Sequence, residues 1–186
     1  MQRFTRLNRV LAAGALAMAA FVSMTQSAQA GPPAPTVPSA IQVPDGNKVF
    51  LVGHAIGVQL YTCTARADGF EWQFGGPQAD LYDDHGNLFA THFGGPTWQA
   101  KDGSFAVGQR VDGVTVDTTA VPWLLLTASP AAGPDGDRLA GTTFIQRVAT
   151  TGGVAPAAGS CHEGTVGTTE EVPYTADYYF WKASAN

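Results

Sequence analysis

The sequence contains few basic residues, and they are scattered along the chain. It has ten Lys and Arg residues against fifteen Asp and Glu, with a formal net charge of −5 at pH 7. Binding to a nucleic acid or to an anionic membrane surface depends on concentrated positive charge, which this chain does not offer. We therefore expect no nucleic acid among its partners, and the acidic balance mainly favours solubility.

Several enzyme motifs are also missing. A dinucleotide site requires G-x-G-x-x-G between a strand and a helix, and the sequence has no such run. It lacks a P-loop, an H-E-x-x-H zinc motif and the G-x-S-x-G turn of α/β-hydrolases. We expect neither NAD nor a nucleotide as cofactor and reject an NAD-dependent dehydrogenase. Carboxylates suited to glycoside hydrolysis are present, but nothing singles out a pair among Glu71, Glu163, Glu170 and Glu171.

Long apolar runs are absent, apart from one near the N-terminus. The stretch VLAAGALAMAAFVSM follows Arg3, Arg6 and Arg9 and precedes the small-residue site Ala28-Gln29-Ala30. This order predicts a secretory signal peptide over residues 1–30. The run is shorter than the ~20 residues of a membrane span, so we expect no membrane span after signal removal. The mature protein is expected to be exported, either periplasmic or secreted.

Removal of residues 1–30 makes the chain more acidic. These residues hold three of the ten basic residues and none of the fifteen acidic ones, so the remainder has seven against fifteen and a net charge of −8. Residues 31–40 are rich in Pro and Ala and predict an extended linker. Residues 41–183 show no internal repeat and are long enough for a single domain with its own core.

Cysteine is scarce, with Cys63 and Cys161 as the two examples. In an oxidising compartment, such a pair most simply forms a disulfide. The alternative, a redox-active or metal-binding thiolate pair, lacks C-x-x-C spacing. We predict one structural disulfide that closes a loop of about a hundred residues.

No segment after the signal has a convincing helical stripe, whereas several have strand patterns. Between residues 70 and 74, three aromatic residues alternate with Glu71 and Gln73. Other β-type runs are NKVFLVGHAIGVQLYTCTA, PWLLLTA, GTTFIQRVAT and ADYYFWK. Turn sequences such as PDGN, KDGS and VDGV separate them. The pattern predicts an all-β fold, an antiparallel β-sandwich or barrel, as a single domain with one disulfide.

Finer expectations follow from the same runs. Gly53 and Gly57 suggest bulges, and PWLLLTA suggests a strand buried on both faces. Alternation places Tyr178 and Phe180 on one face of the last strand, opposite Tyr179 and Trp181. Four tryptophans are expected in the core or at its rim: Trp72, Trp98, Trp123 and Trp181.

Residues 81–93 predict a hairpin that contains His92. A turn over residues 83–87 leads into a returning strand over 88–93, in which Thr91 and Phe93 share the face opposite His92. A half-buried histidine in such a place commonly hydrogen-bonds a loop carbonyl. We therefore expect His92 to fix the following Gly-Gly-Pro corner rather than to act as a catalyst.

Five segments in order also resemble a known family. They are HAIGVQLYTC, THFGGPTWQAKDGS, VPWLLL, IQRVATTGGVAPAAGSC and VPYTADYYFW. These segments are similar to successive motifs of the domain of unknown function 3455 family, a group of exported bacterial and fungal proteins. The resemblance runs from about Ile41 to Trp181. It implies no settled activity, substrate or catalytic residue, and the missing dinucleotide motif argues against the malate-dehydrogenase label that some relatives carry.

The resemblance also indicates which residues lie at motif positions. These are His54, Cys63, His92, Pro96, Trp98, Asp102, Gly103, Ser104, Gln146, Arg147, Cys161, Tyr174, Asp177 and Tyr178. One position departs from the pattern, because Gln99 stands where such motifs often have Glu. That difference removes one carboxylate that a catalytic site could use.

The sharpest chemical hypothesis is a metal site formed by His54, His92 and His162. Three imidazoles from distant strands can meet on a β scaffold and would suit zinc or copper, with Asp102 or Glu163 as a further ligand or supporting residue. No pair has local ligand spacing such as H-x-H. Purely structural roles for the three histidines are the alternative.

A second hypothesis is a ligand-binding site. Its candidate residues are Trp98, Asp102, Arg147 and Tyr178. Aromatic residues and the long loops 129–138 and 150–164 would frame a groove for a glycan or a peptide. In the alternative, the aromatic residues pack in the core, and Arg147 pairs with Asp177 or Asp102 inside the fold.

The sequence favours an exported β-sandwich protein of unresolved activity. Its expected role is a binding or envelope-associated module outside the cytoplasm, with a glycan, a peptide or an envelope component as partner. A metal-dependent enzyme that uses the three histidines and a purely structural surface protein are the alternatives. No residue is assigned as catalytic.

Overall fold

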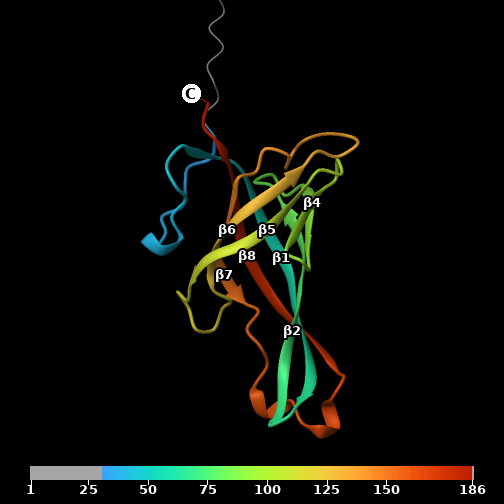
Figure 1. Cartoon of the computed structure of the whole chain (residues 1–186). Coiled ribbons are helices and arrows are strands. Elements are labelled where there is room, and N and C mark those ends of the chain that lie inside the picture. Colours follow the sequence, from blue (N-terminus) through green and yellow to red (C-terminus); the bar gives the residue numbers. More distant parts are fainter. Residues whose placement is uncertain (1–30, 186) are drawn as a thin grey trace, which may run out of the picture.

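The computed structural model describes residues 31–185, so the predicted signal peptide lies outside the described residues. Figure 1 shows strands joined by loops, with three short 3-10 helices as the other regular elements of residues 31–185. The strands are β1 (Asn47–Arg66), β2 (Gly69–Tyr82), β3 (Leu88–Phe93), β4 (Thr97–Ala100), β5 (Phe105–Val114), β6 (Trp123–Ala131), β7 (Phe144–Gly152) and β8 (Thr169–Ala183). The 3-10 helices are η1 (Ser39–Ile41), η2 (Ala158–Ser160) and η3 (Glu163–Thr165). No helix within 31–185 is long and apolar enough to cross a membrane.

The strands form a closed barrel in which each strand pairs with its neighbours in sequence and β1 pairs with β8. Every pairing is antiparallel. The β1–β8 pairing runs from Asn47 opposite Ala183 to Thr62 opposite Thr169. Of the two predicted architectures, the barrel is therefore the one observed, because this long pairing closes the sheet on itself.

The predicted hairpin is confirmed, with β2 ending at Tyr82 and β3 beginning at Leu88. In the turn, Oδ1 of Asp83 accepts hydrogen bonds from the backbone N–H groups of His85 at 3.0 Å and Asn87 at 2.9 Å. A short side chain that satisfies its own turn in this way is typical of aspartate.

The predicted bulges at Gly53 and Gly57 are not found. Register shifts in β1 follow Val49 and Leu60 instead. At Gly57 an added Cβ would lie 2.1 Å from the carbonyl oxygen of Gln78, so glycine is required there by the close approach of β2.

The VDGV segment at residues 111–114, predicted as a turn, is also different. It lies inside β5, where the register against β6 shifts between Arg110 and Asp112. The shift indicates a bulge, which accommodates the extra residue without ending the strand.

The core lies inside the barrel. Its largest fully buried members include Trp98, Tyr178, Phe89, Phe180, Leu81, Leu139 and Ile145. The other three tryptophans are half-buried, which confirms their predicted place in the core or at its rim. Tyr178 and Phe180 face inward, whereas Tyr179 and Trp181 are half-buried, as alternation predicts.

A narrow extension projects beyond the barrel and contains the distal parts of β1, β2 and β8 together with η2 and η3 (Figure 1). The predicted disulfide is confirmed there, since Cys63 and Cys161 are joined by an S–S bond of 2.04 Å. Cys63 lies in β1 and Cys161 directly follows η2. The disulfide therefore fixes the η2–η3 loop to the side of the β1–β2 hairpin.

Candidate ligand-binding site

An aromatic cluster forms where β3 and β4 face β8. His92 and Trp98 are paired in register, and their rings stack with 4.1 Å between centroids and 5° between planes. The ring of Tyr178 meets both edge-on, at 5.1 Å from His92 and 5.2 Å from Trp98. Stacked and edge-to-face contacts of this kind stabilise aromatic pairs, so the three rings support one another as one wall.

The protonation state of His92 follows from its surroundings. Nδ1 lies 2.9 Å from the carbonyl oxygen of Thr97, and a carbonyl only accepts, so Nδ1–H donates. Burial lowers the pKa of His92 to about 3, more strongly than the bond to Thr97 raises it. The imidazole is therefore neutral at physiological pH, with an unprotonated Nε2. The predicted bond to a backbone carbonyl is found, although Thr97 is the first residue of β4 rather than part of the loop, and the side chain is buried more deeply than expected.

Arg147 projects from β7 next to this cluster, and its charge is not neutralised. Its Nε and Nη2 donate to the carbonyl oxygen of Pro122 at 3.1 and 2.8 Å. Among residues 31–185, no carboxylate lies within 4.0 Å of its guanidinium. The predicted pairing of Arg147 with Asp177 or Asp102 is wrong, because those carboxylates have other partners.

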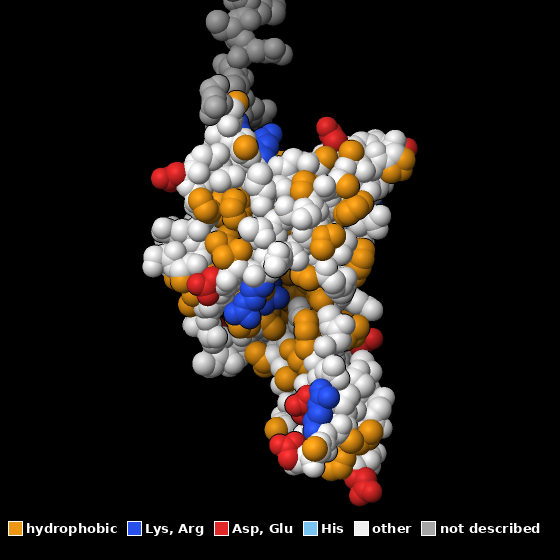
Figure 2. Space-filling model, viewed as in Figure 1, with side chains coloured by type: hydrophobic (Ala, Val, Ile, Leu, Met, Phe, Trp, Pro, Cys, Tyr) orange, Lys and Arg blue, Asp and Glu red, His pale blue; other side chains and the backbone are white. Residues whose placement is uncertain are grey.

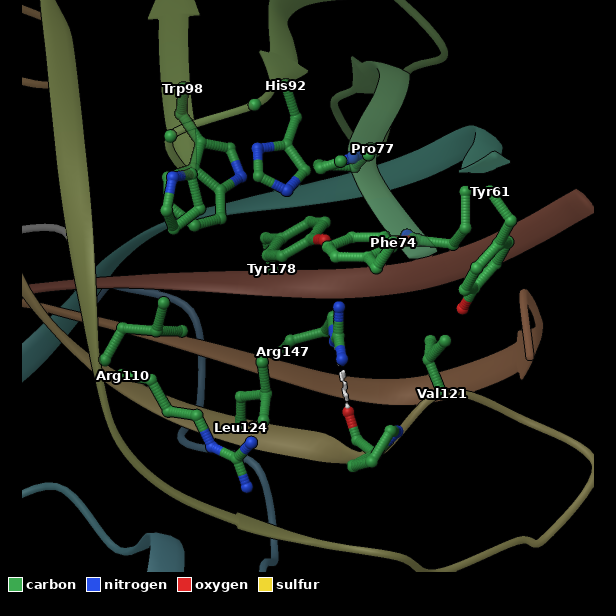
Figure 3. A pocket seen from close by; sticks show the side chains of 18 residues that line it. Tyr61, Phe74, Pro77, His92, Trp98, Arg110, Val121, Leu124, Arg147 and Tyr178 are labelled. Carbon is green, nitrogen blue, oxygen red and sulfur yellow. Dashed lines mark hydrogen bonds between the residues drawn. The ribbon is translucent and has the colours of Figure 1, made fainter. Parts of the chain in front are cut away.

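A cavity of about 510 Å³ opens between the aromatic cluster and Arg147 (Figure 3). Its walls come from all eight strands and from the turn between β3 and β4. Most lining side chains are aromatic or aliphatic, and Arg110 and Arg147 carry the charges. Figure 2 shows basic side chains beside hydrophobic surface at the lower part of the barrel. The predicted groove loops 129–138 and 150–164 supply no lining residue; Gly94–Pro96 and Val121–Pro122 are there instead.

Two buried N–H groups at this cavity have no hydrogen-bond partner among the described residues. They are Nε2 of Gln59 and Nε1 of Trp98, and both side chains are 1% exposed. Buried donors in folded proteins are almost always paired. Both residues line the same cavity, so the two donors mark one region of its wall as a candidate binding site.

Asp102, the fourth predicted ligand-binding residue, is not at the cavity. Its Oδ1 accepts hydrogen bonds from the backbone N–H and the hydroxyl of Ser104 at 2.9 and 2.6 Å, and its Oδ2 accepts from the backbone N–H of Arg138 at 2.9 Å. The hydroxyl of Ser104 lowers the pKa of Asp102 most, followed by the Arg138 backbone. Asp102 therefore holds two loops together, whereas Trp98, Arg147 and Tyr178 do lie together around the cavity.

The structure does not bring His54, His92 and His162 together. The imidazole of His54 lies between Asp177 at 2.7 Å and Asp84 at 2.9 Å, and His162 accepts a bond from the backbone N–H of Gly164 at the start of η3. Residues 31–185 contain no group of three or more His, Cys, Asp or Glu arranged to hold a metal ion. The three histidines lie in different places, with His92 buried in the barrel and His162 at the start of η3, and each has a local partner, so they do not form the predicted joint site.

Sequence reasoning missed several cavity residues, above all Gln59 and Arg110. The alternation of Val58 and Leu60 with Gln59 would place the apolar pair inside, yet Gln59 is 1% exposed and the two apolar residues are half-buried. A usable signal was Tyr61, which shares the face of Gln59 and the buried Cys63. Nothing in the sequence distinguishes Arg110.

A comparison with family models matches residues 44–182 to the model described as "Protein of unknown function (DUF3455)". The chain belongs to the DUF3455 family. The match covers all eight strands except Ala183, the last residue of β8, and it includes every residue that lines the cavity. Comparisons with curated proteins and with solved structures found no match. Membership in DUF3455 thus supplies no activity, and any function has to be argued from the cavity.

Proposed function

We propose that this DUF3455 protein is exported and binds a small molecule in the barrel cavity. The observation that carries the proposal is the pair of unpartnered buried donors, on Gln59 and Trp98, in the wall of one cavity. A buried donor without a partner is unfavourable by about 1–3 kcal/mol. A ligand with acceptor atoms would remove that cost at both positions when it binds.

The shape of the cavity supports a small molecule. Its volume of about 510 Å³ lies within the range of small-molecule sites, which combine apolar walls with a few polar groups. The stacked rings of His92 and Trp98 form one wall, and Tyr61 and Phe74, with 5.5 Å between centroids, line another part. These rings would hold a planar or otherwise flat apolar body.

Binding fits the chemistry of the lining better than catalysis does. Among the residues around the cavity, His92 is the one with the usual chemistry of a general base. A general base works best when its pKa lies near the working pH, and the pKa of His92 is lowered to about 3. Its imidazole therefore supports the cavity wall and offers Nε2 as a hydrogen-bond acceptor.

Export is supported by the predicted signal peptide and by the disulfide between Cys63 and Cys161. Disulfides persist in oxidising compartments and are rare in the cytosol. Secretion of a reporter fused behind residues 1–40, and its loss when the apolar run is interrupted by arginine, would test this part. Retention of the intact fusion in the cytoplasm would contradict it.

The binding proposal is tested by ligand-observed NMR with a fragment library that contains neutral, anionic and cationic planar compounds. We expect fragments to bind the native protein. The same fragments should not bind the Leu124→Trp variant, because the larger side chain fills the cavity from β6. Val116→Trp is the matched control, because Val116 is 54% exposed and does not line the cavity. Circular dichroism establishes whether each variant folds. If Leu124→Trp does not fold, the smaller substitution Leu124→Phe takes its place.

Two results would overturn the binding proposal. One is a library in which no fragment binds the native protein at millimolar concentration. The other is binding that Leu124→Trp and Val116→Trp leave equally intact, since this places the fragments outside the cavity.

A further inference from the structure

The electrostatics of the cavity differ from those of the whole chain. Among residues 31–185, seven basic residues stand against fifteen acidic ones, yet the cavity lining includes Arg110 and Arg147 and neither Asp nor Glu. His92 adds no charge because it is neutral. A positive cavity in an acidic protein attracts an anion locally while the remaining surface repels it.

Arg147 has more N–H donors than its bonds to Pro122 use. A guanidinium carries five N–H groups in a planar fork, and the carbonyl of Pro122 uses only Nε–H and one N–H of Nη2. In Figure 3, the guanidinium lies between Tyr178 and the Pro122–Val121 side of the cavity, with the bond to Pro122 on one side. The bond fixes the orientation of the guanidinium, which also interacts with the hydroxyl of Tyr178. The N–H groups that neither partner uses are the ones that a ligand can bind.

The unpartnered groups around Arg147 are donors as well. Gln59 Nε2 and Trp98 Nε1 both require an acceptor. A ligand that satisfies these groups must therefore be rich in acceptor atoms, whereas a cation or a pure hydrocarbon would leave them unpaired. The rings of His92, Trp98 and Tyr178 require that the rest of the ligand be flat and apolar.

We propose that the cavity is specific for a small aromatic carboxylate, whose carboxylate group binds Arg147 and whose ring lies against the wall of His92, Trp98 and Tyr178. This inference rests on the proposed binding function. A carboxylate matches one guanidinium fork in charge and geometry. A phosphate dianion carries a second charge, which would require a second arginine inside the cavity. It fits less well, because Arg147 is half-buried whereas Arg110 is exposed to solvent.

The test is isothermal titration calorimetry with four probes that share one ring system: 2-naphthoate, 2-naphthamide, 2-naphthyl phosphate and 2-naphthalenemethanol. We expect 2-naphthoate to bind the native protein at least tenfold more tightly than 2-naphthamide, because only the carboxylate uses the charge of Arg147. Arg147→Gln should abolish that difference, and Arg147→Lys should keep part of it. Arg66→Gln is the control, since Arg66 pairs with Glu71 in the extension, away from the cavity.

The outcomes separate this inference from the proposed function. If 2-naphthamide or the alcohol binds as tightly as 2-naphthoate, the cavity is a binding site and the carboxylate assignment is wrong. If 2-naphthyl phosphate binds most tightly, the anion class is wrong. If none of the four probes binds, the carboxylate assignment is also overturned, and the fragment screen with Leu124→Trp decides the broader proposal. The comparison in the native protein needs no variant, so poor folding of Arg147→Gln would not obscure it.

Discussion

The imidazole of His92 lies parallel to the indole of Trp98, with 4.1 Å between the ring centroids. The two residues face each other across β3 and β4, and the bond from Nδ1 to Thr97 holds the imidazole in place. One ring of this pair can titrate and the other cannot. Of these two rings, His92 is therefore the one through which pH can affect the cavity wall.

Acid should destabilise the barrel through His92. Its pKa is about 3 in the folded protein, below the ordinary value of 6.5. Below pH 6.5, the unfolded chain binds a proton that the folded protein takes up only near pH 3, so stability falls as the pH falls through this window. We expect a loss of roughly 4 kcal/mol between pH 6.5 and pH 3 from this residue, measured by urea unfolding at several pH values.

The contribution of His92 is isolated by comparison with His92→Phe, which keeps a ring at this position and cannot titrate. The difference in unfolding free energy between the native protein and His92→Phe should change steeply between pH 6.5 and pH 3. His85→Gln in the exposed turn is the control. Parallel pH profiles for the native protein and His92→Phe would contradict the prediction.

The contribution of His54 to stability should depend on pH with the opposite sign. Its hydrogen bond to Asp84 raises its pKa most, followed by the bond to Asp177, and both outweigh the lowering by burial. The stabilisation is therefore present below pH 6.5 and is lost as the pH rises through the raised pKa. In an NMR titration, the imidazole of His54 should titrate above 6.5, and Asp84→Asn and Asp177→Asn should each lower its midpoint. A midpoint that neither substitution moves would rule out the ion pairs as the cause.

Gly57→Ala should strongly destabilise the barrel. A Cβ at this position would lie 2.1 Å from the carbonyl oxygen of Gln78 and 2.5 Å from Cα of Ala79, and backbone atoms of a paired strand cannot easily move away. We expect a loss of at least about 2 kcal/mol in chemical unfolding. Gly159→Ala is the matched control, because a Cβ there meets nothing within 4 Å. Equal stability of the two variants would mean that β1 and β2 are not so closely paired at Gly57.

Gln59→Met should stabilise the empty protein and weaken binding. The substitution keeps the length of the side chain and removes the unpartnered Nε2, so the unfolding free energy should rise by about 1 kcal/mol. Binding of the best fragment should weaken, because the protein no longer offers the Nε2 donor to the fragment. Scanning calorimetry with and without the ligand measures both effects. A variant that is destabilised when empty would show that Nε2 already has a partner in the free protein.

Strand positions could be predicted from the sequence because they depend on local patterns. Alternation placed Tyr178 and Phe180 on one face and Tyr179 and Trp181 on the other, and the turn over residues 83–87 predicted the β2–β3 hairpin. The disulfide followed from the two cysteines and the expected compartment. In each case, the deciding information lies within a few residues or in the composition.

The surroundings of individual side chains depend on which strands pair with one another, and a single sequence does not specify that pairing. Gly57 is explained by the approach of Gln78 from β2, and Arg147 by the carbonyl of Pro122 rather than by a carboxylate. The burial of Gln59 reverses the local hydrophobic pattern, because its side chain faces the interior of the barrel and lines the cavity. Trp98, Arg147 and Tyr178 were predicted together with Asp102 as one set of ligand-binding candidates, and the barrel brings the first three together without Asp102.

The pairing of β1 with β8 also has a consequence for how the chain acquires its structure. The first strand of the barrel cannot be completed until the last one is available, since Asn47 pairs with Ala183. Contacts between such distant parts of a chain form slowly, and until then β1 presents an open edge that can pair with other chains. If the chain is exported as proposed, a polypeptide that is still crossing the membrane has no closed core, and the pairing of β8 with β1 is the step that closes the barrel.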